Sequence, residues 1–426
     1  MSAELSQSPL TSPLSAADID EAVQRISGVV RRSPLQYSER LSEATGATVF
    51  LKREDLQTVR SYKLRGAHNL LMQLSDEEIA AGVVCSSAGN HAQGFAMACR
   101  SMGIHGRVYV PAKTPKQKRD RIRYHGREFI ELIAIGKTYD EAAAAALEDV
   151  ARTGATLVPP YDDLRTMAGQ GTIAAEILDQ LDSEPDLVIV PVGGGGCISG
   201  ITTYLAGRTT GTSVLGVEPA GAAAMIAALA AGEPVTLDHV DQFVDGAAVN
   251  RAGTLPYAAL AAAGDMVSIT TVDEGAVCTA MLDVYQNEGI IAEPAGALSV
   301  AALMEADIEP DSTVVCLISG GNNDVSRYNE VLERSLVHLG LKHYFLVDFP
   351  QEPGALRRFL DTVLGPNDDI TLFEYVKRNN RETGPALIGI ELGSVDGLPE
   401  LLNRMTTAPT DVERIVPGSA AYRYLT

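Results

Sequence analysis

The chain of 426 residues has no tryptophan, and aromatic residues make up only 5% of it. Proteins that bind single-stranded nucleic acid stack bases on aromatic side chains, so this composition disfavours that class. Basic residues are also in deficit, with 34 Lys and Arg against 55 Asp and Glu and a formal charge of −21. Such an excess of acid argues against nucleic acid or an anionic membrane as a partner, because both are polyanions.

Cysteine is scarce as well. The five cysteines, at 85, 99, 197, 278 and 316, are widely spaced and form no Cys-x-x-Cys, which predicts neither a disulfide framework nor a zinc site. The seven histidines form no His-x-x-x-His, so we expect no metal site. The N-terminus lacks the pattern of a signal peptide, and the longest weakly polar run, 220–231, is shorter than the roughly 18 residues that span a bilayer. We therefore expect a soluble, cytoplasmic protein.

The rest of the composition, 46% hydrophobic and 21% charged, is that of a folded protein. Residues 1–14 are rich in Ser and Pro and are expected to be disordered, with a helix beginning after Ser15. Farther along, short β-branched runs alternate with glycine-containing turns and Ala-rich helical segments; these runs lie at 83–85, 108–110, 187–192, 214–217, 267–271 and 314–318. This alternation predicts an α/β fold with open sheets, in which ligands bind at the carboxyl ends of the strands.

The pattern changes near residue 338. Segments of strand, helix, strand, strand and helix type follow at 343–349, 355–363, 370–376, 386–392 and 398–405. This order is typical of a ferredoxin-like α+β module. We therefore expect one domain over 15–337 and a second over 338–426.

Lys63 lies in Ser61-Tyr62-Lys63-Leu64-Arg65-Gly66-Ala67, at the predicted start of a helix that runs to about Leu74. The positive end of the helix dipole lowers the pKa of an amine there, which suits a lysine that acts as a nucleophile or forms a Schiff base. A solvated surface lysine is the alternative.

Two further strand-to-helix turns carry small residues. Ser86-Ser87-Ala88-Gly89-Asn90-His91 could bind a carboxylate through free backbone N–H groups, or could be an ordinary capped turn. Gly193-Gly194-Gly195-Gly196-Cys197 favours close approach of backbone N–H groups to a phosphate, although it does not fit Gly-x-Gly-x-x-Gly. Ser319 follows another strand and could hydrogen-bond a heteroatom of a ligand.

A basic segment lies between residues 107 and 127. Its eight basic residues favour a solvated helix face.

Taken together, these motifs are the parts of a pyridoxal-phosphate site. With Glu293-Pro294-Ala295-Gly296-Ala297 and Ser319-Gly320-Gly321-Asn322 following in order, residues from about 20 to 337 resemble the threonine dehydratases of the tryptophan-synthase-β-like, fold-type-II family. That fold has two open twisted sheets, with a small subdomain inserted at about 66–158. The tail, with Phe349-Pro350-Gln351-Glu352-Pro353-Gly354, resembles a single ACT-like regulatory domain, as in the short biosynthetic form.

The resemblance implies roles for individual residues. Lys63 would form the Schiff base with the cofactor and then remove the α-proton, with Tyr62 packed beside the cofactor where the family usually has Phe. Asn90 would hydrogen-bond the phenolic oxygen, Ser319 would meet the pyridine nitrogen, and Gly193, Gly194, Gly195, Gly196 and Cys197 would hold the phosphate. Ser87, Ala88, Gly89 and His91 would hold the substrate carboxylate, and Glu293 would line the substrate side.

The resemblance also implies the reaction. L-Threonine, or L-serine, would lose its hydroxyl and amino groups, and threonine would yield 2-oxobutanoate and ammonia for isoleucine biosynthesis. L-Isoleucine would inhibit through the tail, with L-valine as an opposing effector, and the enzyme would be a homotetramer. Phe373, Glu374 and Tyr375 are candidate effector contacts. Some relatives bind a divalent cation near Glu218, but 222 and 224 are Ala here, so no such metal is expected.

Other interpretations remain open. A catabolic serine/threonine dehydratase or a β-replacement enzyme on the same fold would use the same catalytic motifs. A non-catalytic amino-acid sensor is a further alternative, which the intact set of Lys63, Asn90, glycine loop and Ser319 disfavours. The tail could also be a docking module that only builds the oligomer.

Overall fold

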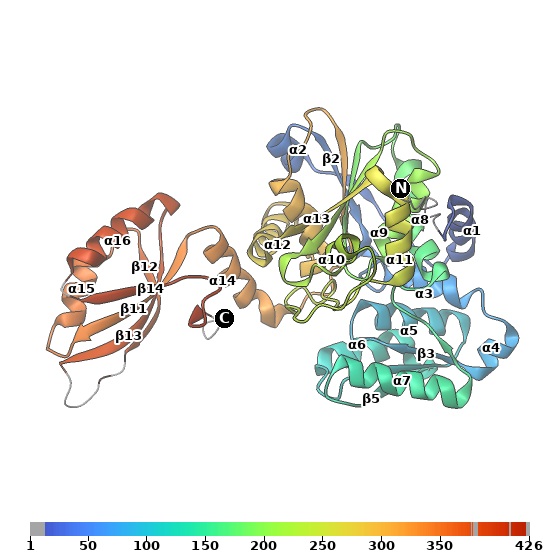
Figure 1. The fold of residues 1–426 in the computed structure, drawn as a ribbon, viewed down its shortest axis with the longest axis horizontal. Helices are drawn as coiled ribbons and strands as arrows, with labels where there is room; N and C mark the ends of the chain where they lie inside the picture. Colours follow the sequence, from blue (N-terminus) through green and yellow to red (C-terminus); the bar gives the residue numbers. More distant parts are fainter. Residues whose placement is uncertain (1–12, 376, 378–381, 409, 423–426) are drawn as a thin grey trace, which may run out of the picture. The chain divides into compact units, whose positions relative to one another are not determined.

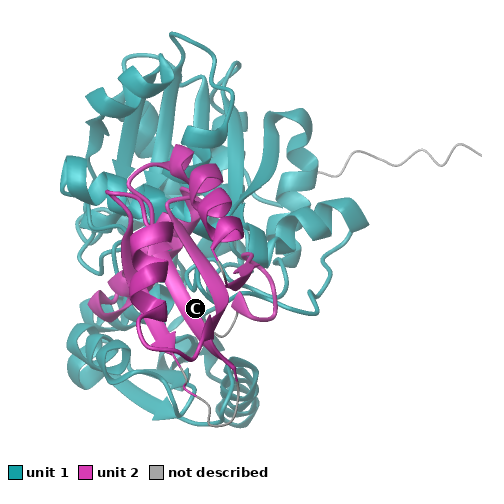
Figure 2. Ribbon diagram, turned by 90° about the vertical axis from the view of Figure 1, so that its left-hand side faces the viewer, with its two compact units in different colours: residues 1–323 teal, residues 324–426 magenta. Residues whose placement is uncertain are grey.

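The structure, a computed structural model, describes residues 13–375, 377, 382–408 and 410–422. The chain divides into two compact units, residues 1–323 and 324–426, which Figure 2 colours separately. We expected the division near 338; helix α14 (Tyr328–His338) instead belongs to the second unit. Most of the predicted disordered segment lies outside the described residues, but Leu14 is buried in the core of the first unit.

The larger sheet of the first unit, which contains the strand labelled β2 in Figure 1, has the strand order β1-β2-β10-β7-β8-β9. Its strands are β1 (Leu35–Tyr37), β2 (Thr48–Arg53), β7 (Leu187–Pro191), β8 (Ser213–Pro219), β9 (Val267–Val272) and β10 (Thr313–Ile318). Only β1 runs antiparallel to its neighbour. The carboxyl ends of the parallel strands therefore meet at one edge, where the glycine loop after β7 and Ser319 after β10 both lie.

A second parallel sheet lies in the first unit and has the order β5-β4-β3-β6. Its strands are β3 (Val83–Ser86), β4 (Gly106–Val110), β5 (Ile130–Ala134) and β6 (Thr156–Leu157). All four lie within the subdomain predicted at about 66–158. The α/β class with two open sheets is thus confirmed.

Helices cover both sheets of the first unit. They are α1 (Ala16–Ile26), α2 (Glu39–Thr45), α3 (Lys63–Leu71), α4 (Asp76–Ala81), α5 (Asn90–Met102), α6 (Lys116–Gly126), α7 (Tyr139–Thr153), α8 (Leu164–Gln180), α9 (Gly196–Ala206), α10 (Ala224–Ala231), α11 (Thr254–Ala263), α12 (Glu274–Glu288) and α13 (Pro294–Glu305). Helix α1 begins as predicted, because the side chains of Ser15 and Asp18 form a capping box. Helix α3 ends three residues earlier than predicted.

The second unit contains the predicted ferredoxin-like module. Its elements after α14 are β11 (Lys342–Pro350), α15 (Ala355–Val363), β12 (Asp369–Tyr375), β13 (Thr383–Glu391), α16 (Leu398–Thr407) and β14 (Asp411–Ile415). The strand β14 was not predicted, because Asp411-Val-Glu-Arg-Ile alternates in only five residues. The antiparallel order β12-β13-β11-β14 places β12 and β14 at opposite edges. Residue 376, assigned to the second predicted strand, lies outside the described residues.

Within the described part of the chain, no helix is both long enough and apolar enough to cross a membrane.

Candidate active site

Lys63 is the first residue of α3, as the sequence predicts. Its segment is held against the end of β10, because the backbone N–H of Tyr62 donates to the carbonyl of Ser319 over 3.2 Å. The Lys63 ammonium donates to the carbonyl of Pro160 at 3.1 Å and lies 5.1 Å from the centre of the Tyr62 ring. Burial lowers the pKa of Lys63 to about 8, so the unprotonated amine is accessible near neutral pH.

A glycine brings the second motif close to Lys63. A Cβ atom on Gly94, in α5, would lie 2.9 Å from the backbone carbon of Lys63 and from the backbone nitrogen of Leu64. Real Cβ atoms essentially never approach backbone so closely, so only glycine allows α5 to pack on the first turn of α3. The N-terminus of α5 is thereby positioned beside the lysine.

Asn90, the first residue of α5, forms a polar chain across the site. Its Nδ2 donates to Oε1 of Glu293 at 2.5 Å, and its Oδ1 accepts from Nδ2 of Asn322 at 2.7 Å. Asn322 also donates to the carbonyl of Val59 at 2.8 Å. Burial, reinforced by the charge of Asp245, raises the pKa of Glu293 to about 7, so this carboxyl is partly protonated near neutrality.

The turn before α5 presents small residues as predicted. The hydroxyl of Ser87 accepts from the backbone N–H of Gly89 at 3.2 Å, and Ala88 packs against the core of the smaller sheet. The side chain of His91 points elsewhere, since its Nε2 lies 2.8 Å from the carbonyl of Val158. Burial and the nearby charge of Lys63 lower the pKa of His91 to about 4, so its ring is neutral. Only its backbone N–H can therefore serve an anion at this turn.

The four glycines after β7 are packed too closely for any side chain. A Cβ atom on Gly193 would lie 3.0 Å from the backbone of Ala247. A Cβ atom on Gly194 or Gly196 would lie within 2.9 Å of Tyr161, and one on Gly195 would lie within 2.9 Å of Met225. Gly195 also has a φ of +91°, which favours glycine. Helix α9 starts at Gly196, so backbone N–H groups and the positive end of the helix dipole meet at this loop.

Cys197 and Ser319 complete the set. Cys197 is buried, and burial raises the pKa of its thiol to about 12, so it is neutral and contributes its backbone N–H. Ser319, at the end of β10, is also buried, and its hydroxyl donates to the carbonyl of Ala295 at 3.2 Å. The hydroxyl hydrogen can rotate, so the same group can instead donate to an acceptor atom of a ligand.

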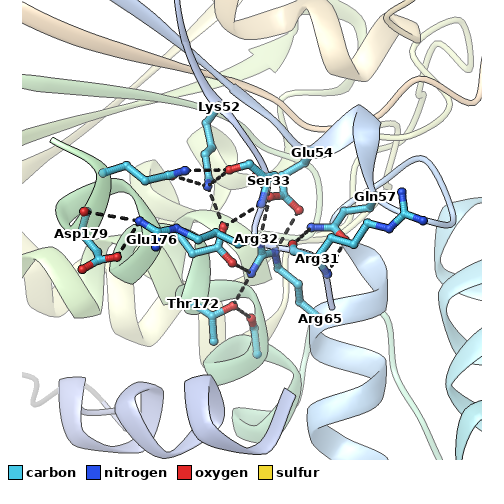
Figure 3. A network of polar contacts seen from close by, with 12 residues as sticks. Arg31, Arg32, Ser33, Lys52, Glu54, Gln57, Arg65, Thr172, Glu176 and Asp179 are labelled. Atoms are coloured by element: carbon cyan, nitrogen blue, oxygen red, sulfur yellow. Dashed lines mark hydrogen bonds and ion pairs between the residues drawn. The ribbon is translucent and has the colours of Figure 1, made fainter. Parts of the chain in front are cut away.

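A buried ionic network surrounds Arg65 of α3 (Figure 3). Arg65, two residues after Lys63, is fully buried and pairs with Glu54 at 2.7 Å and with Glu176 at 2.8 Å. Lys52, also fully buried, pairs with Glu176 at 2.6 Å. These contacts tie α3 to β2 and α8, and they hold the Lys63 turn in position.

The site fits the cofactor that the sequence predicts. The lysine amine is bound by a carbonyl and not by a carboxylate, so it remains available as a nucleophile. The glycine loop is a cradle without side chains at a helix N-terminus, as a phosphate requires. The buried hydroxyl of Ser61, which neighbours Tyr62, has no hydrogen-bond partner.

The side chain of Glu218 lies at the N-terminus of helix α10. Its carboxylate accepts from the backbone N–H groups of Met225 at 2.7 Å and Ile226 at 2.9 Å, at the start of α10. Burial raises its pKa to about 7. Among the described residues, no group of three His, Cys, Asp or Glu is arranged to hold a metal ion.

Several contributors were not predicted. Tyr161 covers the glycine loop, and the carbonyl of Pro160 holds Lys63 although the two residues are 97 positions apart. Nothing in the local sequence marks either residue. On α6, Lys118 pairs with Asp245 at 2.7 Å and Arg121 donates to Asn322, so part of the basic segment contacts the larger subdomain instead of solvent.

The candidate effector residues lie in the second unit. Phe373, Glu374 and Tyr375 lie on β12, and the rings of Phe373 and Tyr375 each lie 6.1 Å from that of Phe349. Two of the three therefore take part in aromatic packing of their own module. Their role as effector contacts remains a prediction.

Comparisons with known proteins identify the family to which the chain belongs. Residues 26–320 match the family described as pyridoxal-phosphate dependent enzyme, and residues 333–425 match the C-terminal regulatory domain of threonine dehydratase. A Mycobacterium tuberculosis protein named L-threonine dehydratase biosynthetic IlvA is 83% identical, with all of both chains covered. The Corynebacterium glutamicum protein of the same name is 60% identical, over 96% of this chain and 95% of its own.

Two solved structures support the fold. The processed form of threonine deaminase isoform 2 from Solanum lycopersicum has a TM-score of 0.70 and 35% identity, over 78% of this chain and 93% of its own. Maize serine racemase has a TM-score of 0.69 and 30% identity, over 76% and 98% of the two chains. With a lysine, a glycine cradle and a regulatory module all in place, the chain belongs to the pyridoxal-phosphate-dependent family of biosynthetic threonine dehydratases.

Proposed function

We propose that this protein converts L-threonine into 2-oxobutanoate and ammonia, the first committed step toward isoleucine. The observation that carries the proposal is the buried Lys63 amine, whose pKa is lowered to about 8 beside a glycine cradle and at the end of β10. The net reaction is balanced, because the water lost with the β-hydroxyl is regained when the enamine product is hydrolysed.

The cofactor, when bound, supplies an electron sink for the electrons of the broken Cα–H bond. Lys63 would hold the cofactor and then accept the α-proton at its amine. Backbone N–H groups from Gly193 to Cys197 would bind the phosphate, Asn90 would donate to the phenolic oxygen, and Ser319 would meet the pyridine nitrogen. A serine partner leaves that nitrogen largely neutral, which favours loss of the hydroxyl over longer-lived carbanion chemistry.

The substrate side is assigned from the same geometry. The turn Ser87-Ala88-Gly89 and the backbone N–H of His91 lie at the N-terminus of α5, which suits a carboxylate. Glu293, with a pKa near 7 and bound to Asn90, would line the side where the β-hydroxyl departs. L-Serine, which lacks one methyl group, is a second substrate, since one methylene changes binding by only about 1–3 kcal/mol.

The second unit would make the enzyme sensitive to its pathway product. We infer inhibition by L-isoleucine, with L-valine as an opposing effector, because the module matches a threonine-dehydratase regulatory domain. An effector acts only if it binds two conformational states with different affinity. We expect the protein to form a homotetramer, which light scattering would test. We also expect it in the cytoplasm, because its five free, buried thiols fit a reducing environment.

The first test is the initial rate of 2-oxobutanoate formation from L-threonine, with and without L-isoleucine. We expect turnover that isoleucine suppresses. In Lys63→Ala, turnover and the visible absorbance of the lysine-bound cofactor should both disappear, because no other amine replaces this one at the end of β10. Retained turnover in that variant would refute the proposal. Lys52→Ala is not a suitable control, because Lys52 is buried in the ionic network and its loss would destabilise the protein. The exposed Lys116, in contrast, should tolerate alanine without loss of rate.

A further inference from the structure

A chain of side-chain hydrogen bonds begins at Arg121, on α6, and ends in the candidate active site. The Arg121 guanidinium donates to Oδ1 of Asn322. Nδ2 of Asn322 donates to Oδ1 of Asn90 at 2.7 Å, and Nδ2 of Asn90 donates to Oε1 of Glu293 at 2.5 Å. Arg121 is therefore connected to Asn90, the residue that we assign to the cofactor, through a single intervening side chain.

The direction of these hydrogen bonds is fixed by two groups that cannot exchange their roles. A guanidinium has donors and no acceptor, so Arg121 can face only the oxygen of the Asn322 amide. The carbonyl of Val59 has no hydrogen to donate, so it can face only the NH2 group of Asn322, which donates to it at 2.8 Å. Turning this amide around would place a donor against Arg121 and an acceptor against Val59. The orientation of Asn322 is thus determined from both sides.

The orientation of Asn322 sets that of Asn90 in turn. Because the Nδ2 group of Asn322 can only donate, Asn90 must present its Oδ1 to it. The Nδ2 group of Asn90 is then left on the side of Glu293, and its second hydrogen can be donated to the cofactor. A phenolic oxygen that accepts such a donor is stabilised in its ionised form.

Arg121 occupies an unfavourable environment for a cation. It is partly buried, and burial together with the charge of Arg60 lowers its pKa, while the charge of Glu293 acts in the opposite direction. Its acceptor is an uncharged amide, whereas Lys118, one turn earlier on α6, pairs with the carboxylate of Asp245 at 2.7 Å. That ion pair already joins α6 to the larger subdomain, so docking of the helix does not account for Arg121.

We propose that Arg121 is a positioning residue for the reaction, which orients Asn90 through Asn322 so that a donor faces the phenolic oxygen of the cofactor. The inference rests on the proposed function, because it assigns a task in that reaction to a residue outside the cofactor site. Arg121 and Asn322 are 201 positions apart, so the sequence did not connect them. An amide that is held in advance needs no reorientation when the cofactor binds.

The test compares variants of the full-length holoenzyme by absorbance and by steady-state kinetics. Arg121→Met removes the donor and retains an unbranched side chain. The ratio of visible to near-ultraviolet absorbance of the lysine-bound cofactor should fall by about twofold or more, because the ionised phenolic oxygen loses a positioned donor. With L-threonine, kcat should fall by about tenfold and KM should change by less than about twofold, because the turn proposed for the substrate carboxylate keeps its structure.

Two further substitutions at the same position test the direction of donation. Arg121→Lys keeps a positive group that only donates, so it should restore most of the absorbance ratio and of kcat. Arg121→Gln keeps a planar polar group, but its amide can turn to donate or to accept, so it should restore less than the lysine does.

Matched controls come from the same helix. Lys118→Met breaks the ion pair with Asp245, another contact of α6 with the larger subdomain, and should leave the absorbance ratio of the parent protein. Arg123→Met removes an arginine whose side chain is 56% exposed, and it should alter neither the absorbance nor the kinetics.

Three outcomes would overturn the inference. A parental absorbance ratio in Arg121→Met would show that Asn90 keeps its orientation without the cation. Equal losses in Arg121→Met and Lys118→Met would show that Arg121 only holds α6 in place. If Arg121→Met does not fold, equal ratios in Arg121→Lys and Arg121→Gln would have the same meaning. In contrast, a parent protein that binds the cofactor but does not turn over threonine, with a lowered ratio in Arg121→Met, would refute the proposed reaction and leave the positioning role standing.

Discussion

Arg65 shows how a single buried side chain can support the turn that carries Lys63. Its guanidinium is fully buried, which by itself lowers the pKa of Arg65, but the charges and hydrogen bonds of Glu54 and Glu176 outweigh burial and keep that pKa above its usual range. Its partners are Glu54, directly after β2, and Glu176 in α8 (Figure 3). Local propensity alone would have marked Arg65 only as a good helix former.

We predict that Arg65→Met destabilises the first unit by about 3–5 kcal/mol, because it leaves buried carboxylates without a partner. Denaturant-induced unfolding of the full chain measures this change. The control is Arg32→Met, since Arg32 and Asp179 form an ion pair whose side chains are 54% and 70% exposed. A pair so exposed contributes only about 0–1 kcal/mol, and equal losses in the two variants would contradict the role assigned to the network.

The amine of Lys63 leads to a prediction about pH. Its pKa is lowered to about 8 because burial disfavours the charged form, so the neutral nucleophile accumulates as the pH rises toward 8. Below that pH, the rate at which apoprotein captures the cofactor should increase about tenfold per pH unit, and above it the rate should level off.

The reference for this measurement is the reaction of the same cofactor with Nα-acetyl-lysine. Its amine titrates near 10.4, so its rate should continue to rise past pH 8. The ratio of the two rates removes the cofactor's own titration. A ratio that does not vary between pH 6 and 9 would show that the Lys63 amine is not perturbed.

The contact between α3 and α5 depends on one glycine. A Cβ on Gly94 would meet the backbone of Lys63 and Leu64, and backbone cannot move aside as a flexible side chain can. The sequence pattern Asn90-His-Ala-Gln-Gly94 predicted a helix but not the distance of its closest neighbour. That distance is what places the turn before α5 next to Lys63.

We therefore expect Gly94→Ala to destabilise the protein by about 1–3 kcal/mol through overpacking and to weaken cofactor binding. Thermal unfolding and cofactor titration followed by absorbance measure the two effects. Gly211→Ala serves as the control, because nothing lies within 4 Å of a Cβ there. A cofactor affinity in Gly94→Ala equal to that of the control would contradict the close approach.

The elements themselves were largely predictable. The runs at 187–192, 214–217 and 314–318 became β7, β8 and β10, because continuous β-branched runs are typical of buried parallel strands. The strand β2 was missed, since Thr48–Arg53 ends in two charged residues. Both charges are buried and paired, Lys52 with Glu176 and Arg53 with Asp55, which periodicity cannot foresee.

In the whole molecule, catalysis and control are assigned to separate units. Every residue that we assign to cofactor or substrate lies before the division at residue 323, and the candidate effector contacts Phe373, Glu374 and Tyr375 lie after it. The division falls before α14, not at the change of pattern near 338, because α14 packs with β11. A helix between two domains carries no sequence signal that tells which core it joins.

This arrangement predicts the effect of truncation. A chain that ends after Asn323 should bind the cofactor and deaminate threonine, but L-isoleucine should no longer inhibit it. Rate assays with and without isoleucine measure this, with the full chain as the reference. Persistent inhibition in the truncated chain would show that isoleucine acts at the catalytic unit itself.

The candidate cofactor site could be predicted from the sequence, because each of its main residues lies in a short motif at the end of a strand or the start of a helix. Lys63, the glycine loop and Ser319 were predicted as site residues from short motifs, because these motifs occur together and in an order that resembles one enzyme family. The carbonyl of Pro160 on Lys63, the bond from Asn90 to Glu293 and the bond from Arg121 to Asn322 join residues that are distant in the chain. Such contacts are decided by how helices and sheets pack, because burial and neighbours, and not residue type alone, set which polar groups meet and what charge they carry.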